Sequence, residues 1–98
     1  MTPPFSVRTS LHFDRLAETL TRRQPDFAAR YDRARAILGH DPYNRARQHH
    51  IKKLESIPAG AGQWRLALGH FRFRYDVAGQ DVVLKYCGLR REDTYRDR

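Results

Sequence analysis

Four basic residues fall at alternating positions in the second half of the chain. They are Arg65, Arg72, Arg74 and Lys85, and each stands among apolar residues that alternate with them. Because successive side chains of a β-strand point to opposite faces, we expect these four on one face of a sheet, which we call the cationic face. A guanidinium group grips phosphate through two parallel hydrogen bonds. The spacing therefore predicts a surface suited to phosphate.

The same charges are compatible with an ordinary solvated face. Asp76, Asp81 and Glu92 lie near enough in the sequence to neutralise them locally. Like charges gathered on a sheet repel one another, and this favours a compensating anion. We therefore favour a binding role for the cationic face over the solvated alternative.

The polar tail from Arg90 to Arg98 holds one aromatic residue, Tyr95, among several arginines. This tyrosine could anchor the tail on the sheet, stack on a nucleic-acid base or assist proton transfer from a ribose hydroxyl. The residues alone leave these roles open.

Other kinds of chemistry have little support in the sequence. There is no dinucleotide glycine fingerprint, no phosphate-loop motif and no Ser/His/Asp arrangement. His49 and His50 are adjacent, and without further Cys or His at ligand spacing we predict no metal site and no cofactor. Cys87 is interpreted as a packing residue. Trp64 is in register with Leu66, which favours burial.

The composition indicates one small basic domain spanning residues 1–98. Lysine and arginine number 19 against 11 acidic residues, a formal net charge of +8 that attracts polyanions such as nucleic acid, acidic membranes or acidic proteins. A single cysteine allows no internal disulfide, and neither a secretory signal nor a membrane-spanning run is evident. These features predict a cytoplasmic protein without membrane contact.

The first half of the chain is expected to form a short strand and two helices. Residues 3–9 alternate like an edge strand, and Ser10 can cap a helix running to about Arg23. The apolar face of this helix is predicted to hold Leu11, Leu16, Ala17 and Leu20. Pro25 opens a second helix, which Gly39 ends as a left-handed stop. Its apolar face is predicted to hold Phe27, Tyr31, Ala34 and Leu38.

The second half changes to a period of two. Between 43 and 57 the spacing of Ile51, Leu54 and Ile57 predicts a helical turn or two, and residues 58–62 look like a flexible connector. Strands are expected at 64–68, 71–77 and 81–87, joined by turns at 69–70 and 78–80. In the last strand Val82, Leu84 and Tyr86 are predicted on one side, with Val83, Lys85 and Cys87 on the other. The predicted fold is α+β, a short N-terminal strand and a helical hairpin packed on a three- to four-stranded antiparallel sheet.

The later half of the sequence resembles the RelE/ParE toxin family. The matching pieces are Lys53-Leu54, a glycine-containing loop, the strands of 63–75, the apolar strand at 82–84, and Arg90-Arg91-Glu92-Asp93-Thr94-Tyr95. The two strands of 63–75 read aromatic-Arg-Leu-x-hydrophobic-Gly and aromatic-Arg-hydrophobic-x-Tyr. The helical hairpin agrees with the family only in order and length.

This resemblance implies a toxin that a neighbouring antitoxin neutralises. Many members bind in the ribosomal A site and cut messenger RNA without a metal ion. The ribose 2′-hydroxyl attacks the adjoining phosphate while basic side chains offset the developing charge. The physics is compatible, since preorganised guanidinium groups can stabilise that charge and the 2′-hydroxyl exists only in RNA.

The resemblance also implies roles for particular residues. Arg65 and Arg72 would stabilise the phosphate, Arg91 would assist or protonate the leaving oxygen, and Tyr95 would orient the nucleophile or stack on a base. Further RNA contacts are expected from Lys52, Lys53, Arg74, Lys85 and Arg90. Ala67 stands where several ribosome-dependent members carry a second basic residue, a charge that Arg74 or Lys85 could replace.

Two other functions remain open. One branch of the superfamily has the same fold and inhibits DNA gyrase without cutting anything, and a basic nucleic-acid-binding module without toxicity is a third possibility. The arginines at 65 and 72 and the terminal tyrosine favour the RNA-cutting branch. In each case we expect an acidic, partly disordered antitoxin as a partner, and for the nuclease also the ribosome and messenger RNA.

Overall fold

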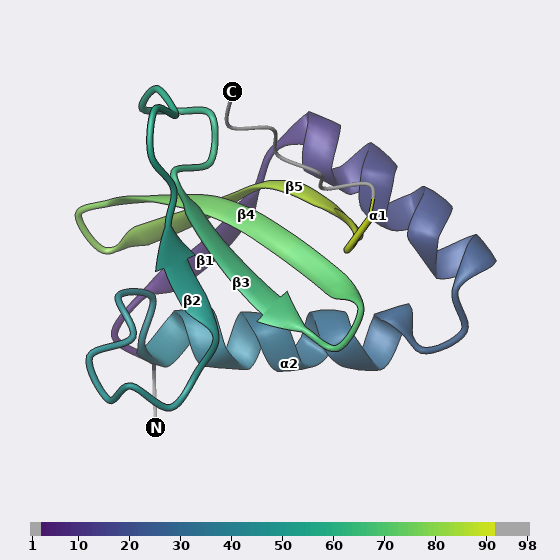
Figure 1. Cartoon of the computed structure of the whole chain (residues 1–98), viewed down its shortest axis with the longest axis horizontal. Coiled ribbons are helices and arrows are strands. Elements are labelled where there is room, and N and C mark those ends of the chain that lie inside the picture. Colours follow the sequence, from purple (N-terminus) through teal and green to yellow (C-terminus); the bar gives the residue numbers. More distant parts are fainter. Residues whose placement is uncertain (1–2, 92–98) are drawn as a thin grey trace.

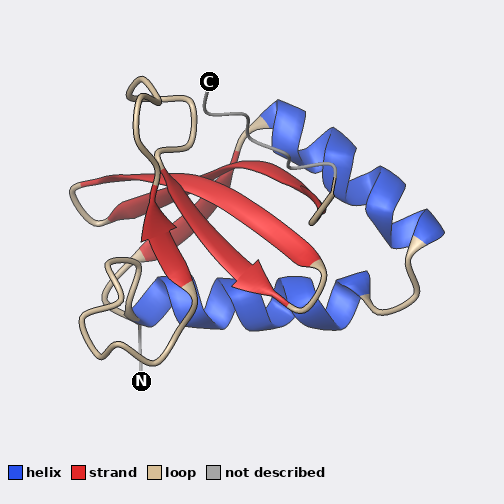
Figure 2. Cartoon of the chain, viewed as in Figure 1, coloured by secondary structure: helices blue, strands red, loops and turns tan. Residues whose placement is uncertain are grey.

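A computed structural model describes residues 3–91, which fold into two helices and a five-stranded sheet (Figure 1, Figure 2). The elements in chain order are β1 (Ser6–Thr9), α1 (Leu11–Arg23), α2 (Phe27–His40), β2 (Ile51–Lys53), β3 (Trp64–Leu68), β4 (Phe71–Ala78) and β5 (Asp81–Leu89). In space the strands lie in the order β1-β5-β4-β3-β2. Both helices pack on one face of this sheet and leave the other, the outer face, uncovered by helix. No helix in residues 3–91 combines the length and apolarity that a membrane span requires.

The sheet is larger than predicted and it is mixed. Its three central strands form the expected antiparallel meander, but β1 pairs with β5 in parallel, with Ser6 opposite Asp81. The helical hairpin is the crossover that carries the chain from β1 to the rest of the sheet, and a crossover of this length allows parallel pairing.

A strand replaces the helical turns predicted between residues 43 and 57. β2 pairs antiparallel with β3, and Ile51 lies opposite the buried Leu66. Without β2 the edge of β3 would present unpaired amide and carbonyl groups. The pairing requirement of this edge therefore outweighs the weak three-residue periodicity.

Helix α1 begins where predicted but turns a different side toward the core. Ser10 Oγ accepts a hydrogen bond from the Phe13 amide at 3.0 Å, which caps the helix. The buried residues are Phe13, Ala17 and Leu20, whereas Leu11 is 67% exposed. The prediction of Leu11 in the core was therefore wrong, and Phe13 occupies that place.

In α2 the predicted apolar face is confirmed, but Gly39 does not end the helix. Phe27, Ala34 and Leu38 are buried, and Tyr31 is half-buried against them. Gly39 is the penultimate residue of the helix and is not left-handed. A Cβ atom there would lie 3.3 Å from Pro3, and the Phe5 amide donates to the Gly39 carbonyl oxygen at 3.0 Å. The glycine thus allows the N-terminal segment to approach the helix closely.

Aromatic rings fill the space between helices and sheet. The Phe27 ring lies 5.3 Å from Phe71 and 5.9 Å from Phe73 between centroids. Trp64, which was predicted to be buried, is half-buried and stacks on the buried Tyr75. The Tyr75 hydroxyl donates to the Pro42 carbonyl oxygen at 2.6 Å, and burial raises the pKa of this phenol above its usual range.

A β-bulge in β5 changes the side on which its later residues lie. Arg74 pairs with Tyr86 and Tyr75 pairs with Leu84, so Lys85 is an extra residue without a partner position on β4. From this point on, the residues of β5 lie on the face of the sheet opposite to the one that regular alternation predicts. Cys87 is consequently buried, and Tyr86, predicted on the core side with Leu84, lies on the outer face beside Arg74.

Candidate nucleic-acid interface

The outer face brings the predicted basic residues together in two rows across the strands. One row joins Lys52, Arg65, Arg74 and Tyr86 through the registers of β2, β3, β4 and β5. The next row joins Ala67, Arg72 and Gly88. These positions alternate with buried residues of β3 and β4, so their side chains lie away from the helices. The cationic face therefore exists as a surface of neighbouring strands.

A pocket of about 370 Å³ lies over Ala67. It is lined by His49, His50, Ile51, Lys52, Arg65, Ala67 and Arg72, and we call it the Ala67 pocket. Ala67 contributes only a methyl group between much longer basic side chains, which leaves a hollow at this point. Ala67 thus forms the floor of a cationic pocket.

The loop after α2 carries two histidines to this pocket. Asp41 Oδ1 accepts from the Arg45 amide at 2.8 Å and Oδ2 from the Ala46 amide at 3.0 Å. The Asn44 side chain bonds both the amide and the carbonyl of His49. Desolvation of the Asp41 carboxylate acts against its charged form, but the two amide hydrogen bonds and the nearby charges of His49 and Arg45 together outweigh it and lower the pKa of Asp41. Local hydrogen bonds, and not helical turns, thus set the path of residues 41–49.

The Arg72 guanidinium is fixed at the turn between β3 and β4. Nη1 donates to the carbonyl oxygens of Gly69 at 2.9 Å and Phe71 at 2.8 Å. The turn itself has Gly69 in the left-handed region, with a φ of 59°. Two backbone acceptors therefore hold Arg72 in place before any ligand binds.

Arg74 is fixed at the other end of the face by the 58–62 loop. Its Nε donates to the Gly62 carbonyl at 3.2 Å and its Nη2 to the Ala61 carbonyl at 2.9 Å. Gly62 approaches the sheet so closely that a Cβ would lie 3.1 Å from that of Arg74. The prediction of a flexible connector was wrong in this respect, because the loop is bonded to the outer face.

Two carboxylates predicted to neutralise the cationic face are engaged elsewhere. Asp76 accepts from the amides of Gly62 and Gln63, both at 2.9 Å. Asp81 pairs with Arg8 at 3.2 Å on the exposed edge of the sheet. Glu92 lies outside the described residues. Asp76 therefore binds backbone amides and Asp81 binds Arg8, so neither carboxylate neutralises the cationic face as expected.

A second pocket of about 360 Å³ lies beside Arg74 on the same face. It is lined by Ser10, His12, Gly60, Ala61, Arg74, Lys85 and Tyr86, and we call it the Tyr86 pocket. Sequence reasoning missed Tyr86 because the bulge is not visible in the alternation. Gly88 was the available signal, since a glycine inside a strand often marks a close approach.

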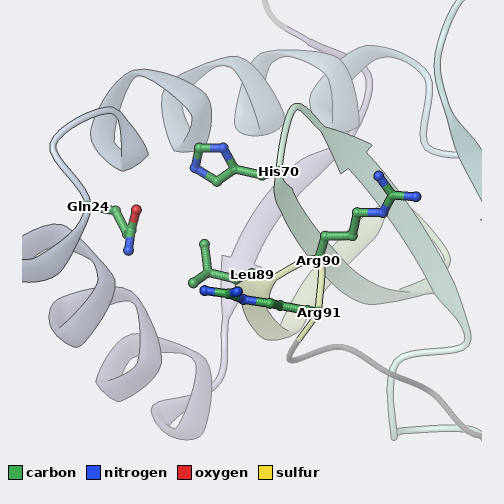
Figure 3. A pocket seen from close by; sticks show the side chains of 5 residues that line it. All are labelled: Gln24, His70, Leu89, Arg90 and Arg91. Atoms are coloured by element: carbon green, nitrogen blue, oxygen red, sulfur yellow. The ribbon is translucent and has the colours of Figure 1, made fainter.

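The remaining residues that were predicted to contact RNA lie away from these two pockets or outside residues 3–91. Lys53 Nζ lies 5.7 Å from the Trp64 ring centroid, on the core side of the sheet edge. Arg90 and Arg91 follow β5 and line a pocket of about 390 Å³ with Gln24, His70 and Leu89. In Figure 3 Arg91 reaches along Leu89 toward the helices, whereas Arg90 points away from the other four side chains. Tyr95 is outside the described residues.

Neither a metal centre nor a reactive thiol is found in the described part of the chain. Within residues 3–91 no three His, Cys, Asp or Glu side chains group as a metal site would require. Burial raises the pKa of the Cys87 thiol to about 12. The chemistry open to the outer face is therefore that of guanidinium, ammonium, imidazole and phenol groups.

Comparison with known proteins identifies the fold. No protein-family model matches the sequence, and a search of curated proteins found no match. The chain is similar to one in the crystal structure of the archaeal RelE-RelB complex from Pyrococcus horikoshii OT3, with a TM-score of 0.65 and 20% identity. The likeness covers 89% of this chain and 96% of the other. The predicted α+β fold of the RelE kind is thereby confirmed, with a five-stranded sheet.

Proposed function

We propose that this protein, which has the RelE fold, is the toxin of a toxin-antitoxin pair and cleaves messenger RNA in the ribosomal A site. The observation that supports this function best is the convergence of Arg65, Arg72 and Lys52 on one exposed pocket of the sheet. A net charge of +8 would draw the protein to RNA.

The proposed reaction needs no group beyond those of the chain and the RNA. The 2′-oxygen forms a bond to the adjoining phosphorus while the bond from phosphorus to the 5′-oxygen breaks. The products are a 2′,3′-cyclic phosphate and a 5′-hydroxyl, so one proton leaves the 2′-oxygen and one reaches the 5′-oxygen. His49 and His50 line the pocket, so one imidazole can accept the proton of the 2′-hydroxyl and the other, when protonated, can supply the proton to the 5′-oxygen.

The arginines would stabilise the transition state. Negative charge grows on the phosphate oxygens as the new bond forms, and donors already in place stabilise it without reorganisation. Arg72, held by Gly69 and Phe71, and Arg65 across the Ala67 pocket are suited to this role. Lys52 would contribute further positive charge.

The structure suggests a change in the roles expected at the end of β5. Arg91 reaches toward the helix side in Figure 3, whereas Arg90 points away from it. Arg90 also follows Gly88 by two residues, which continues the outer-face alternation. We therefore assign the RNA contact near the leaving group to Arg90, with Tyr95 as the candidate to orient the nucleophile or stack on a base.

An acidic antitoxin is the proposed protein partner. The crystal structure that this chain resembles is that of a RelE-RelB complex. A partly disordered acidic chain could cover the outer face by charge complementarity and block its access to RNA.

The proposal is tested by mapping RNA 5′ ends after induced expression. Cuts should appear inside translated frames for the native protein and for Arg15→Ala, a control that removes an exposed cation of α1. Arg65→Ala and Arg72→Ala should each lower the cleavage rate about 100-fold, since each removes one charge-stabilising donor.

Thermal unfolding of the purified variants checks that their fold is intact. Unchanged cleavage in both arginine variants would contradict the assigned roles. Intact messenger together with DNA damage signalling would point to the gyrase-inhibiting branch instead.

A further inference from the structure

We propose that the Tyr86 pocket is a second nucleotide site, which binds the neighbour of the nucleotide held in the Ala67 pocket. In this site the base stacks on the Tyr86 ring, and Lys85 and Arg74 hold the phosphate. The proposal rests on the proposed function, because the occupant is the same single-stranded RNA.

The two pockets lie close enough together for one continuous strand of RNA to occupy both. The Ala67 pocket lies over β2, β3 and β4, and the Tyr86 pocket lies over β4 and β5. Neighbouring strands are about 4.8 Å apart, so the two pockets are roughly 5 to 10 Å apart across the sheet. Arg65 and Arg74, which pair in register, connect them with positive charge.

The charges in the Tyr86 pocket favour a phosphate group. Lys85 has no hydrogen bond or ion pair to any residue between 3 and 91. Arg74 has its Nε and Nη2 bound to loop carbonyls, and Nη1 makes no hydrogen bond within the same range. Its guanidinium plane is therefore fixed while one donor stays available for an anion.

The aromatic ring beside these charges favours a nucleotide over a simple anion. Tyr86 is half-buried, and its ring centroid lies 5.9 Å from Arg74 Cζ. A Cβ on Gly88 would lie 2.9 Å from Tyr86 Cζ, so glycine is what lets the ring rest on the strand. A ring fixed in this way can stack on a base of any sequence.

The size of the site and its accessibility agree with an unpaired base. A volume of about 360 Å³ falls within the range of small-ligand sites, roughly 300 to 1,000 Å³. Stacking on a side chain needs a base that is splayed out of a helix, as in single-stranded RNA. Ser10 and His12, which also line the site, offer hydrogen-bonding groups to the edges of the base.

The β-bulge explains how one strand supplies both the cation and the ring. In regular alternation Lys85 and Tyr86 would point to opposite faces. The extra residue at Lys85 brings both side chains to the pocket that Arg74 lines. Bulges commonly re-aim side chains next to functional sites.

The test measures binding of an RNA that cannot be cut. A 2′-O-methyl hexauridylate and a set of abasic versions, each lacking one base, are titrated by NMR into the native protein, Tyr86→Leu, Tyr86→Phe and Lys85→Gln. The native protein and Tyr86→Phe should bind one abasic version about tenfold more weakly than the intact RNA. Tyr86→Leu should bind the intact RNA and that abasic version equally. In the native protein, the backbone amide signals that shift on binding should include those of Lys85 and Tyr86.

The outcomes separate this site from the proposed function. If Tyr86→Leu still discriminates against the missing base, or if Lys85→Gln binds the intact RNA as tightly as the native protein, the site is overturned, whether or not messenger RNA is cut. If base discrimination follows the Tyr86 ring while induced cells keep their messenger intact, the site is supported and the nuclease function fails. Thermal unfolding of each variant confirms that the comparison is made on folded protein.

Discussion

Backbone carbonyl oxygens hold two arginines of β4. Arg72 is held by Gly69 and Phe71, and Arg74 by Ala61 and Gly62. A carbonyl neutralises none of the guanidinium charge, so an anchored arginine still attracts phosphate. A lysine could not replace either one, because it lacks the planar fork that bonds to backbone and ligand together.

Burial of Cys87 leads to a prediction about thiol reactivity. The raised pKa, about 12, keeps the thiol protonated throughout the neutral and mildly alkaline range. We expect native protein to react with a disulfide reagent at least 100-fold more slowly than guanidinium-unfolded protein at pH 8. Raising the pH from 7 to 9 should increase the native rate about 100-fold, because the thiolate fraction of a group with a pKa of about 12 rises tenfold per pH unit, whereas the rate of the unfolded chain should rise only about 25-fold and then level off. Rapid reaction of native protein at pH 8 would show that the strand opens easily there.

At the scale of elements, the 58–62 loop depends on one carboxylate. Asp76 accepts from the amides of Gly62 and Gln63, and Gly62 is buried. Asp76→Ala should lower the free energy of unfolding by about 2 kcal/mol, since both amides lose a charged acceptor. Asp81→Ala is the matched control. It removes an exposed ion pair with Arg8 and should cost less than about 1 kcal/mol.

Denaturant unfolding of the two variants gives this comparison directly. Equal destabilisation would mean that the Asp76 bonds are no stronger than a surface pair. A larger loss for Asp76→Ala would also be expected to loosen Arg74, because the same loop supplies its acceptors.

The elements that the sequence predicts well are those with a strong period. Phe27, Ala34 and Leu38 define α2, and Leu66, Phe73 and Tyr75 define the central strands. The short β2 has too few residues to establish a period. The parallel partner of β1 depends on contacts between distant parts of the chain, which alternation does not encode.

The candidate site was predictable to the same extent. Alternation places Arg65, Arg72 and Arg74 on one face without knowledge of the fold. Alternation fails at Lys85 and Tyr86, because one extra residue in β5 reverses the face of the sheet on which the following side chains lie. Alternation also does not show which groups hold a side chain in place. The structure was therefore needed to distinguish Arg90 from Arg91 and to find the contacts of the 58–62 loop.

At the scale of the whole molecule, the net charge of +8 predicts strong salt dependence of RNA binding. Three or four phosphate contacts should give a slope of about −2 to −3 for log affinity against log salt, at roughly 0.7 per contact on a single strand. Arg72→Ala should reduce the magnitude of that slope by about 0.7. Fluorescence anisotropy with the 2′-O-methyl RNA provides the measurement, and Arg15→Ala should leave the slope unchanged. A slope near zero would argue against phosphate recognition.

The pairing of β1 with β5 also bears on how the molecule is made. Residues 6–9 are synthesised well before their partners at 81–84. Closing such a long loop is slow and is possible only when both ends are free. During synthesis the β1 edge of the sheet therefore stays unpaired until the residues of β5 have been made.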